Sequence, residues 1–438
     1  MEEDGSATAP TADASFEQAA SRAGLVLPPR RRLNPWLAVG IVVVLVGASV
    51  GIGDLTGWAI GPRETGTVGI YGAQQCANVP SYLSVYLTVS VSAHADPALH
   101  DALAGWATDF SEWSGGCVHV VDDSGTGDGY VPDLASDRVE AVVSSALPDV
   151  TDRGSLGSAV SLFPEAANPI SIVYDLPGLT GPLRLTGSVL AGLFDGAITS
   201  WDDPSIATLN PGADLGSAPP VTPVYRSDAS GANAALTGFL ATSSPTWNRS
   251  VGVGEQPAWP DGLAANGSAA MSAALAATPG AVGYLEAGEA VPANSSVALI
   301  ENPAGEFVAP SPVGASAAAA AHENGSAAKR GDWANDSLVA SAGASSYPIT
   351  EFVYFAVYHD LGTAYSDRVS MTNATWLLTF LWWLAVDAGS DVRAAGLGAV
   401  PTTIVGLDEV GLENVTYNGG SLLENNEGGS EGGETGEF

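Results

Sequence analysis

The strongest constraint in this sequence is a repeated order of strand pattern, polar loop and helical pattern. Residues 85–91 alternate and are rich in β-branched side chains, which predicts a strand, and residues 97–113 have the spacing of an amphipathic helix. A second strand pattern at 118–121 runs into the glycine-bearing turn 122–129. This order predicts an α/β fold, in which a ligand crevice lies beyond the carboxyl ends of the strands.

The same order returns further along the chain. A strand pattern at 223–225 leads directly into the loop 226–231, after which residues 234–242 have a helical pattern. Such a loop presents backbone N–H groups at a helix N-terminus, where an anion binds readily. The guanidinium of Arg226 can also fork onto two oxygens. Taken alone, Arg226 and Asp228 are equally well explained as an exposed ion pair of little energetic value.

The length and composition predict more than one lobe. The chain has 438 residues, of which 46% are hydrophobic, enough to bury a substantial core. Further strand patterns lie at 171–174, 280–285 and 351–358. The apolar segment 375–386 is too short to span a bilayer, so we expect a buried core helix there. Residues 421–438 form an acidic, Gly-rich tail that buries little and is expected to be disordered.

An uncharged apolar run at residues 36–53 is just long enough to span a bilayer. Three arginines at 30–32 precede it, and the positive-inside rule places them in the cytoplasm. We therefore expect a cytoplasmic tail at 1–35, a single-pass membrane anchor at 36–53, and a linker at 54–80 leading to an extracytoplasmic main domain. A cleaved signal peptide is the alternative, although such peptides usually have a shorter apolar region and leader.

The chain has two cysteines, Cys76 and Cys117, and both follow the predicted anchor. In an oxidising exterior they could form a disulfide that closes a loop of about 40 residues, which would contribute roughly 4 kcal/mol in the chain-entropy model. Two unrelated buried thiols are the alternative.

The charge balance limits the possible partners. The 48 acidic residues against 14 basic residues give a formal net charge of −34. Nucleic acids and anionic lipids are bound through basic patches, so the sequence argues against both as ligands. The five histidines show no metal-ligand spacing and no Gly-x-Ser-x-Gly elbow occurs, so we expect neither an enzyme nor a cofactor.

Short motifs between residues 163 and 350 occur in a distinctive order. They are Phe163-Pro164, the segment 196–204, Leu209-Asn210-Pro211-Gly212, the loop 226–231, Ser244-Pro245-Thr246-Trp247, Trp259-Pro260-Asp261-Gly262, the segment 279–284, and Tyr347-Pro348-Ile349-Thr350. In this order and spacing they resemble the phosphate-binding subunits of phosphate ABC transporters, which have the type II periplasmic-binding-protein fold. The resemblance covers about 85–407, most of the chain beyond the predicted anchor.

The resemblance implies a two-lobed α/β fold with hinge strands, preceded here by one N-terminal transmembrane helix. Lobe I would combine residues 81–167 and 290–420, and lobe II would be 168–289. Such a protein captures inorganic phosphate or a similar tetrahedral oxyanion between its lobes and delivers it to ABC permease and ATPase subunits, without chemistry. The alternative is a surface or sensory protein that keeps the fold without tight anion binding.

The resemblance also implies ligand contacts. In the family a loop of the form Arg-x-Asp-x-Ser-Gly holds the anion. The corresponding residues here are Arg226, Asp228, Ser230 and Gly231. A second Gly/Ser loop follows the second strand of the family, and its counterpart here would contribute Ser124, Gly125 and Thr126. A plain turn is the alternative explanation of this second loop.

Three departures from the family pattern concern the ligand. Ser145 stands where the family has an aspartate that accepts the proton of a protonated phosphate, which removes the family's basis for preferring phosphate over sulfate. Residues 91–97 replace a glycine-rich first loop, and Ala232 replaces a threonine. The candidate replacement acceptors are Asp96, Asp122, Asp123 and Asp128.

Overall fold

The structure is a computed structural model that describes residues 85–91, 97–122, 134, 139–145, 160–177, 179, 181–322, 333, 336–365, 369–387 and 389–422. All of them belong to the second of two compact units, which are 1–65 and 66–438. The predicted tail 1–35, anchor 36–53 and linker 54–80 lie outside the described residues, as does most of the acidic tail 421–438. None of the helices that are described has the length and apolar character needed to cross a membrane.

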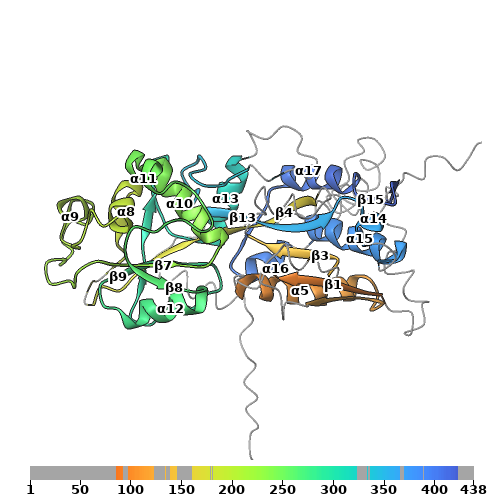
Figure 1. Cartoon of the computed structure of the whole chain (residues 1–438), viewed down its shortest axis with the longest axis horizontal. Helices are drawn as coiled ribbons and strands as arrows, with labels where there is room; N and C mark the ends of the chain where they lie inside the picture. The colour runs from red at the N-terminus through yellow and green to blue at the C-terminus, as the bar shows by residue number, and fades with distance from the viewer. Residues whose placement is uncertain are drawn as a thin grey trace, which may run out of the picture. The chain divides into compact units, whose positions relative to one another are not determined.

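Lobe I is built around a six-stranded sheet with the order β14-β4-β13-β3-β1-β2 (Figure 1). Its strands are β1 (Val85–Val91), β2 (Val118–Asp122), β3 (Ala141–Ser144), β4 (Val160–Pro169), β13 (Thr350–Tyr358) and β14 (Gly398–Ala399). Strand β1 pairs in parallel with both β2 and β3, as the predicted strand-helix-strand order requires. The carboxyl ends of these three strands therefore meet at one edge of the sheet, where a ligand crevice is expected.

Helix α15 (Met371–Asp387) confirms the predicted core helix. Leu377, Leu378 and Phe380 are fully buried, and the Phe380 ring lies 5.0 Å from that of Phe110. These three side chains belong to the hydrophobic core of lobe I. Burying each of them contributes about 1.5–3 kcal/mol to folding. The other helices of lobe I are α5 (Pro97–Trp113), α13 (Pro312–His322), α14 (Leu361–Tyr365), α16 (Gly389–Ala394) and α17 (Thr402–Leu412).

Lobe II contains a five-stranded sheet with the order β10-β5-β9-β7-β8 and a small sheet with the order β12-β11-β6. The strands are β5 (Ser171–Tyr174), β6 (Arg184–Leu185), β7 (Thr222–Arg226), β8 (Leu263–Ala265), β9 (Ala281–Leu285), β10 (Ser296–Val297), β11 (Leu299–Glu301) and β12 (Phe307–Val308). The helices are α8 (Gly187–Phe194), α9 (Pro204–Leu209), α10 (Gly231–Ser243), α11 (Pro245–Ser250) and α12 (Ser268–Ala277). Helices α10 and α12 lie on opposite sides of β7 and β8 in Figure 1.

The two lobes have separate hydrophobic cores. The predicted division at residue 290 assigns residues 296–308 to lobe I, whereas β10 and β11 pair with β5 and β6, and Ala298 and Ile300 pack in the lobe II core. Residues 296–308 thus lie with lobe II. Their short strands extend sheets that are completed by distant segments, so no local pattern reveals which lobe they join.

The chain crosses between the lobes several times, and two of these crossings are adjacent. One joins β4 to β5 at Ile170, and the other leads into β13 at Ile349. The backbone N–H of Ile170 donates to the Ile349 carbonyl at 2.9 Å, and the Tyr347 hydroxyl donates to the Ile170 carbonyl at 2.8 Å. These bonds tie the two crossings into one hinge.

Candidate anion site at the start of helix α10

The 226–231 loop joins the end of β7 to the first residue of α10, as predicted. Ser230 is the N-cap of this helix, and its hydroxyl accepts a hydrogen bond from the Asn233 backbone N–H at 3.2 Å. Arg226, Asp228 and Ser230 are 2%, 8% and 4% exposed, so polar groups with little access to water are concentrated here. The explanation of Arg226 and Asp228 as a surface ion pair is therefore wrong.

The Arg226 guanidinium lies between two carboxylates. Its Nε donates to both carboxylate oxygens of Asp228 at 3.2 and 3.3 Å, Nη2 pairs with Asp228 Oδ2, and Nη1 pairs with Glu286 Oε2 at 2.9 Å. Burial alone would lower the pKa of Arg226, but Glu286 and Asp228 outweigh it and the pKa is raised. Arg226 is thus held charged and fixed in orientation.

The second carboxylate, Glu286, comes from the residue after β9, the parallel neighbour of β7. Ser268 donates to its Oε2 at 2.7 Å and accepts from Arg226 Nη1 at 3.0 Å. Burial raises the pKa of Glu286, and the Arg226 charge opposes that rise. The only signal for Glu286 in the sequence is an acidic residue directly after a strand pattern, which does not by itself indicate a site.

The pKa of Asp228 is lowered. Burial acts to raise it, but hydrogen bonds from Arg226 and from the Gly267 backbone N–H, the latter at 2.7 Å, outweigh burial. Asp228 therefore remains an ionised carboxylate that accepts hydrogen bonds and positions the guanidinium.

A polar scaffold holds the loop from behind. The Tyr284 hydroxyl accepts from the Arg226 backbone N–H at 2.8 Å and donates to the side-chain oxygen of Asn233. Asn233 Nδ2 donates to the carbonyls of Asp228 at 2.9 Å and Glu255 at 2.7 Å. Asn233 has no exposed surface and was missed by sequence reasoning, because its role depends on partners brought together only by folding.

The cavity next to the start of α10 has a volume of about 250 Å³. Its lining combines lobe II residues of α10 with lobe I residues of β13 and of the segment after β3. Its polar and charged lining residues are Ser145, Glu255, Asp336, Ser337, Thr350, Glu351 and Tyr354, and Gly231 lines it too. The structure thus brings Ser145 together with Gly231 of the predicted site, whereas Ser124, Gly125 and Thr126 lie outside the described residues.

Of the four candidate replacement acceptors for Ser145, Asp122 is among the described residues, and it does not line this cavity. Asp122 is exposed and lies 3.0 Å from His100 Nδ1, and Asp96, Asp123 and Asp128 lie outside the described residues. Ala232 is fully buried in lobe II. Cys117 is buried immediately before β2, while Cys76 lies outside the described residues, so their pairing stays a prediction.

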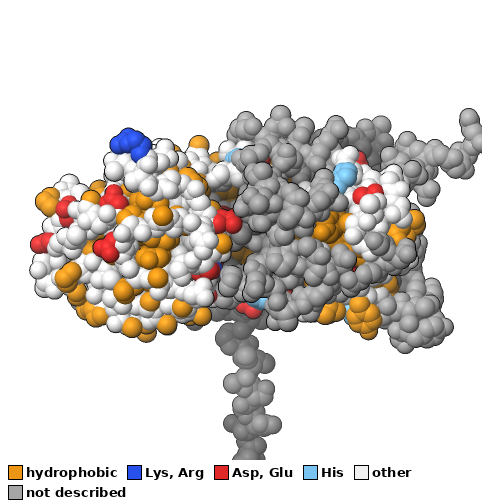
Figure 2. Space-filling model, viewed as in Figure 1, with side chains coloured by type: hydrophobic (Ala, Val, Ile, Leu, Met, Phe, Trp, Pro, Cys, Tyr) orange, Lys and Arg blue, Asp and Glu red, His pale blue; other side chains and the backbone are white. Residues whose placement is uncertain are grey.

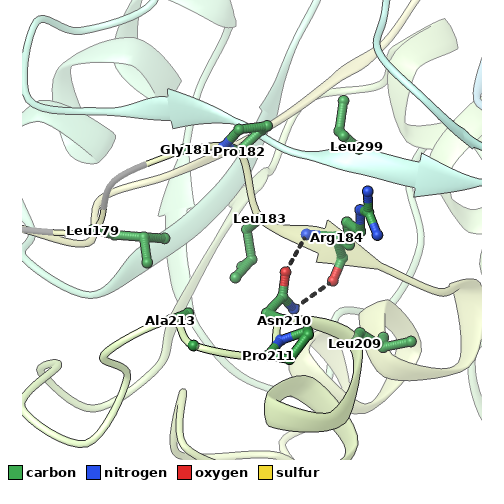
Figure 3. A pocket seen from close by; sticks show the side chains of 11 residues that line it. Leu179, Gly181, Pro182, Leu183, Arg184, Leu209, Asn210, Pro211, Ala213 and Leu299 are labelled. Carbon is green, nitrogen blue, oxygen red and sulfur yellow. Dashed lines mark hydrogen bonds between the residues drawn. The ribbon is translucent and has the colours of Figure 1, made fainter.

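A larger cavity of about 400 Å³ lies at β6 and the end of α9, and contains none of the predicted site residues. Figure 3 shows the Asn210 side chain bridging the backbone of Arg184, accepting from its N–H at 2.7 Å and donating to its carbonyl at 2.9 Å. The Arg184 guanidinium lies 5.5 Å from the ring centre of Phe307. The polar groups at this cavity are therefore used within the protein, and they tie α9 to β6.

Acidic side chains are distributed over the described part of the visible surface rather than gathered on one patch (Figure 2). Exposed charges are screened beyond about 8 Å at physiological salt, whereas a bound anion would contact donors at about 3 Å. The net charge therefore does not forbid an anion at α10. Within the described ranges, no group of three or more His, Cys, Asp or Glu side chains is arranged to hold a metal ion.

Comparison with known proteins agrees with this architecture. The family model of the PBP superfamily domain matches residues 72–388. The phosphate-binding protein PstS of Methanocaldococcus jannaschii is 30% identical over 271 residues, covering 59% of this chain and 69% of that protein. The PstS protein of Haemophilus influenzae is 31% identical over 242 residues, covering 55% of this chain and 68% of that protein.

Solved structures show the same fold at lower identity. A DING protein aligns with a TM-score of 0.55 at 18% identity, covering 76% of this chain and 99% of that chain. A human phosphate binding apolipoprotein aligns with a TM-score of 0.54 at 18% identity, covering 76% of this chain and 99% of that chain. The predicted two-lobed α/β fold is thereby confirmed, and the chain belongs to the PBP superfamily, within the family of PstS phosphate-binding proteins.

Proposed function

We propose that this protein captures phosphate, or a closely similar tetrahedral oxyanion, between its two lobes and delivers it to an ABC importer. The observation that carries the proposal is the loop that begins at the buried Arg226 and ends at Gly231, the first residue of α10. Gly231 lines an inter-lobe cavity, whereas Arg226 lies behind it and is not among the described lining residues. The relatives named PstS are phosphate-binding proteins, and one structural neighbour, a periplasmic phosphate-binding protein with TM-score 0.51 and 19% identity, was solved with bound phosphate.

The anion would be held mainly by the oriented backbone dipoles at the N-terminus of α10. The first-turn amides of α10, including those of Gly231 and Ala232, have no acceptor within the helix itself. The helix N-terminus carries a partial positive charge of roughly half an elementary charge. Arg226 adds a guanidinium whose orientation Asp228 and Glu286 already fix, so little side-chain entropy is lost on binding.

The partners and location follow from the family and the sequence. A receptor of this kind hands its anion to permease and ATPase subunits that are separate chains. The apolar run 36–53 would tether it to the membrane with the two lobes outside the cell, where a Cys76–Cys117 disulfide would be stable. The relatives of this chain are phosphate-binding proteins, so we infer a binding protein and not an enzyme.

The test is calorimetric titration of the full-length protein with phosphate, sulfate and molybdate. Arg226→Lys keeps the charge but loses the planar fork, and is preferred to Arg226→Ala, which would leave Asp228 and Glu286 unpaired at a cost of about 3–5 kcal/mol. We expect phosphate affinity to fall at least tenfold in Arg226→Lys. The matched control is Arg184→Lys in the distant 400 Å³ cavity, which should bind like wild type.

No heat with any oxyanion would refute the transport proposal and favour the alternative, a surface or sensory protein that retains the fold. Wild-type binding by Arg226→Lys would show that the anion binds elsewhere.

A further inference from the structure

Glu351 faces the candidate anion site from the opposite lobe. It is the second residue of the hinge strand β13, and its side chain is 8% exposed. Its Oε1 accepts a hydrogen bond from Asn168 Nδ2 at 3.1 Å, and Asn168 in turn accepts from the Ala287 backbone N–H at 3.2 Å. The carboxylate is therefore positioned by the crossing segments of the hinge.

The other oxygen of Glu351 points at the first residue of α10. A Cβ atom at Gly231 would overlap Glu351 Oε2 and would lie 2.7 Å from the backbone oxygen of Ser145. Gly231, Ser145 and Glu351 also line the same cavity of about 250 Å³. Glu351 thus places a carboxylate oxygen where the helix N-terminus, the predicted ligand loop and residue 145 meet.

We propose that Glu351 accepts the proton of a protonated oxyanion in this site. It would take the role that an aspartate has in the family at the position of Ser145, which carries no carboxylate. This inference rests on the proposed function. A carboxylate beside the helix N-terminus repels an oxyanion that has lost all its protons, and accepts a hydrogen bond from one that retains a proton. Sulfate at neutral pH belongs to the first class and phosphate to the second.

The charges around Arg226 strengthen the argument. Asp228 and Glu286 already pair with its guanidinium, so Arg226 does not present an uncompensated positive charge to the ligand. With Glu351 added, the described groups around the site carry more negative than positive charge. A ligand that brings its own proton suits such a site better than one that brings only negative charge.

The experiment measures the affinities of the full-length protein for phosphate and for sulfate by calorimetric titration at neutral pH. Glu351→Gln keeps the shape and the acceptor for Asn168 but removes the charge. We expect phosphate affinity to fall about tenfold or more, as for loss of a charge-assisted hydrogen bond, while sulfate affinity stays the same or rises. Adding Ser145→Asp to Glu351→Gln should recover part of the lost preference.

Glu301→Gln, in the small sheet of lobe II, is the matched control, because it removes one carboxylate charge at a residue that does not line this cavity. It should keep the wild-type ratio of phosphate to sulfate affinity. The proposal is overturned if Glu351→Gln keeps that ratio, or if the double variant recovers no preference for phosphate over sulfate. If the wild-type protein binds neither anion, the proposed function fails as well. If the wild-type protein binds phosphate but Glu351→Gln leaves the ratio of phosphate to sulfate affinity unchanged, only this inference is wrong.

Discussion

The hydroxyl of Tyr284 joins the two ends of the 226–231 loop, accepting from the Arg226 backbone N–H at 2.8 Å and donating to the side chain of Asn233 in the first turn of α10. Burial raises the pKa of Tyr284, so the hydroxyl keeps its proton and remains a donor. The loop geometry therefore depends on one buried hydroxyl from β9, a different strand of the same sheet.

Removing this hydroxyl is expected to affect both stability and binding. Tyr284→Phe leaves the Arg226 N–H and the Asn233 oxygen without this partner, which should cost about 1–3 kcal/mol of unfolding free energy and weaken phosphate binding. Urea unfolding and calorimetry measure the two effects. Tyr174→Phe is the control, since the Tyr174 hydroxyl accepts from the Leu183 backbone N–H at 2.9 Å, away from the loop. A loss of stability without loss of affinity in Tyr284→Phe would contradict the proposed role of the scaffold.

The charge of Glu286 is expected to limit anion affinity. Glu286→Gln keeps the size of the side chain but removes one of the two carboxylates that compensate Arg226. Phosphate and sulfate should then both bind several-fold more tightly, because the guanidinium presents more positive charge to the ligand. Glu301→Gln, in the small sheet of lobe II, is the control and should leave both affinities unchanged. Weaker binding of both anions by Glu286→Gln would argue that orientation of Arg226 outweighs its net charge.

Asp360 is expected to make stability depend on acid pH. Burial acts to raise its pKa, but hydrogen bonds from the backbone N–H groups of Thr363, Gly419 and Asn418 and from the Thr416 hydroxyl lower it strongly. Because the folded pKa lies below the unfolded value of about 3.9, this stabilisation is full above pH 4 and is lost as pH falls through the folded pKa.

The measurement for Asp360 is urea unfolding at pH 7 and pH 3. Asp360→Ala should lose about 1–2 kcal/mol at pH 7, as for a lost helix cap, and less at pH 3. An equal loss at both pH values would show that the carboxylate charge is not what stabilises the C-terminal hairpin of β15 (Thr416–Tyr417) and β16 (Gly420–Ser421).

Two buried carboxyl groups in lobe I are expected to have the opposite pH dependence. Within the described structure, no hydrogen bond of good geometry reaches Oε1 of Glu165 or either oxygen of Asp408, and the nearby Trp333 indole lowers the pKa of Asp408 by less than burial and Glu165 raise it. Burial raises the pKa of Asp408, which Glu165 raises further, and burial raises that of Glu165. The folded state therefore holds protons that the unfolded state releases above about pH 4, and stability falls as pH rises toward the folded pKa values.

Asp408→Asn should remove part of this loss and raise the unfolding free energy by about 1–3 kcal/mol at pH 8, with a smaller effect at pH 4. Denaturant unfolding at the two pH values measures it. A variant that is destabilised at pH 8 would mean that the carboxyl group of Asp408 is ionised and satisfied there.

The parts of the site that sequence predicts are those whose residues are neighbours in the chain. Arg226, Asp228, Ser230 and Gly231 lie within one strand-loop-helix turn, so their pattern indicates both their structure and their chemistry. Glu286 contacts Arg226 from 60 positions away, and Glu351 reaches Gly231 from the other lobe. Such contacts depend on strand order and lobe packing, which local spacing does not specify.

The fold shows the same division between local and distant information. The strand and helix at 85–113 and the core helix at 375–386 follow from periodicity and hydrophobicity, and the structure has β1, α5 and α15 there. The assignment of residues 296–308 to lobe II depends on pairing with β5 and β6, more than 100 positions earlier in the chain.

The paired crossings at Ile170 and Ile349 constrain how the lobes can move. Because hydrogen bonds hold these two segments side by side, they must bend or twist together when the lobes move. Sliding or separation would break these bonds. Motion of the lobes that keeps these bonds therefore deforms both crossings at once, and a change at either segment would be felt by the other.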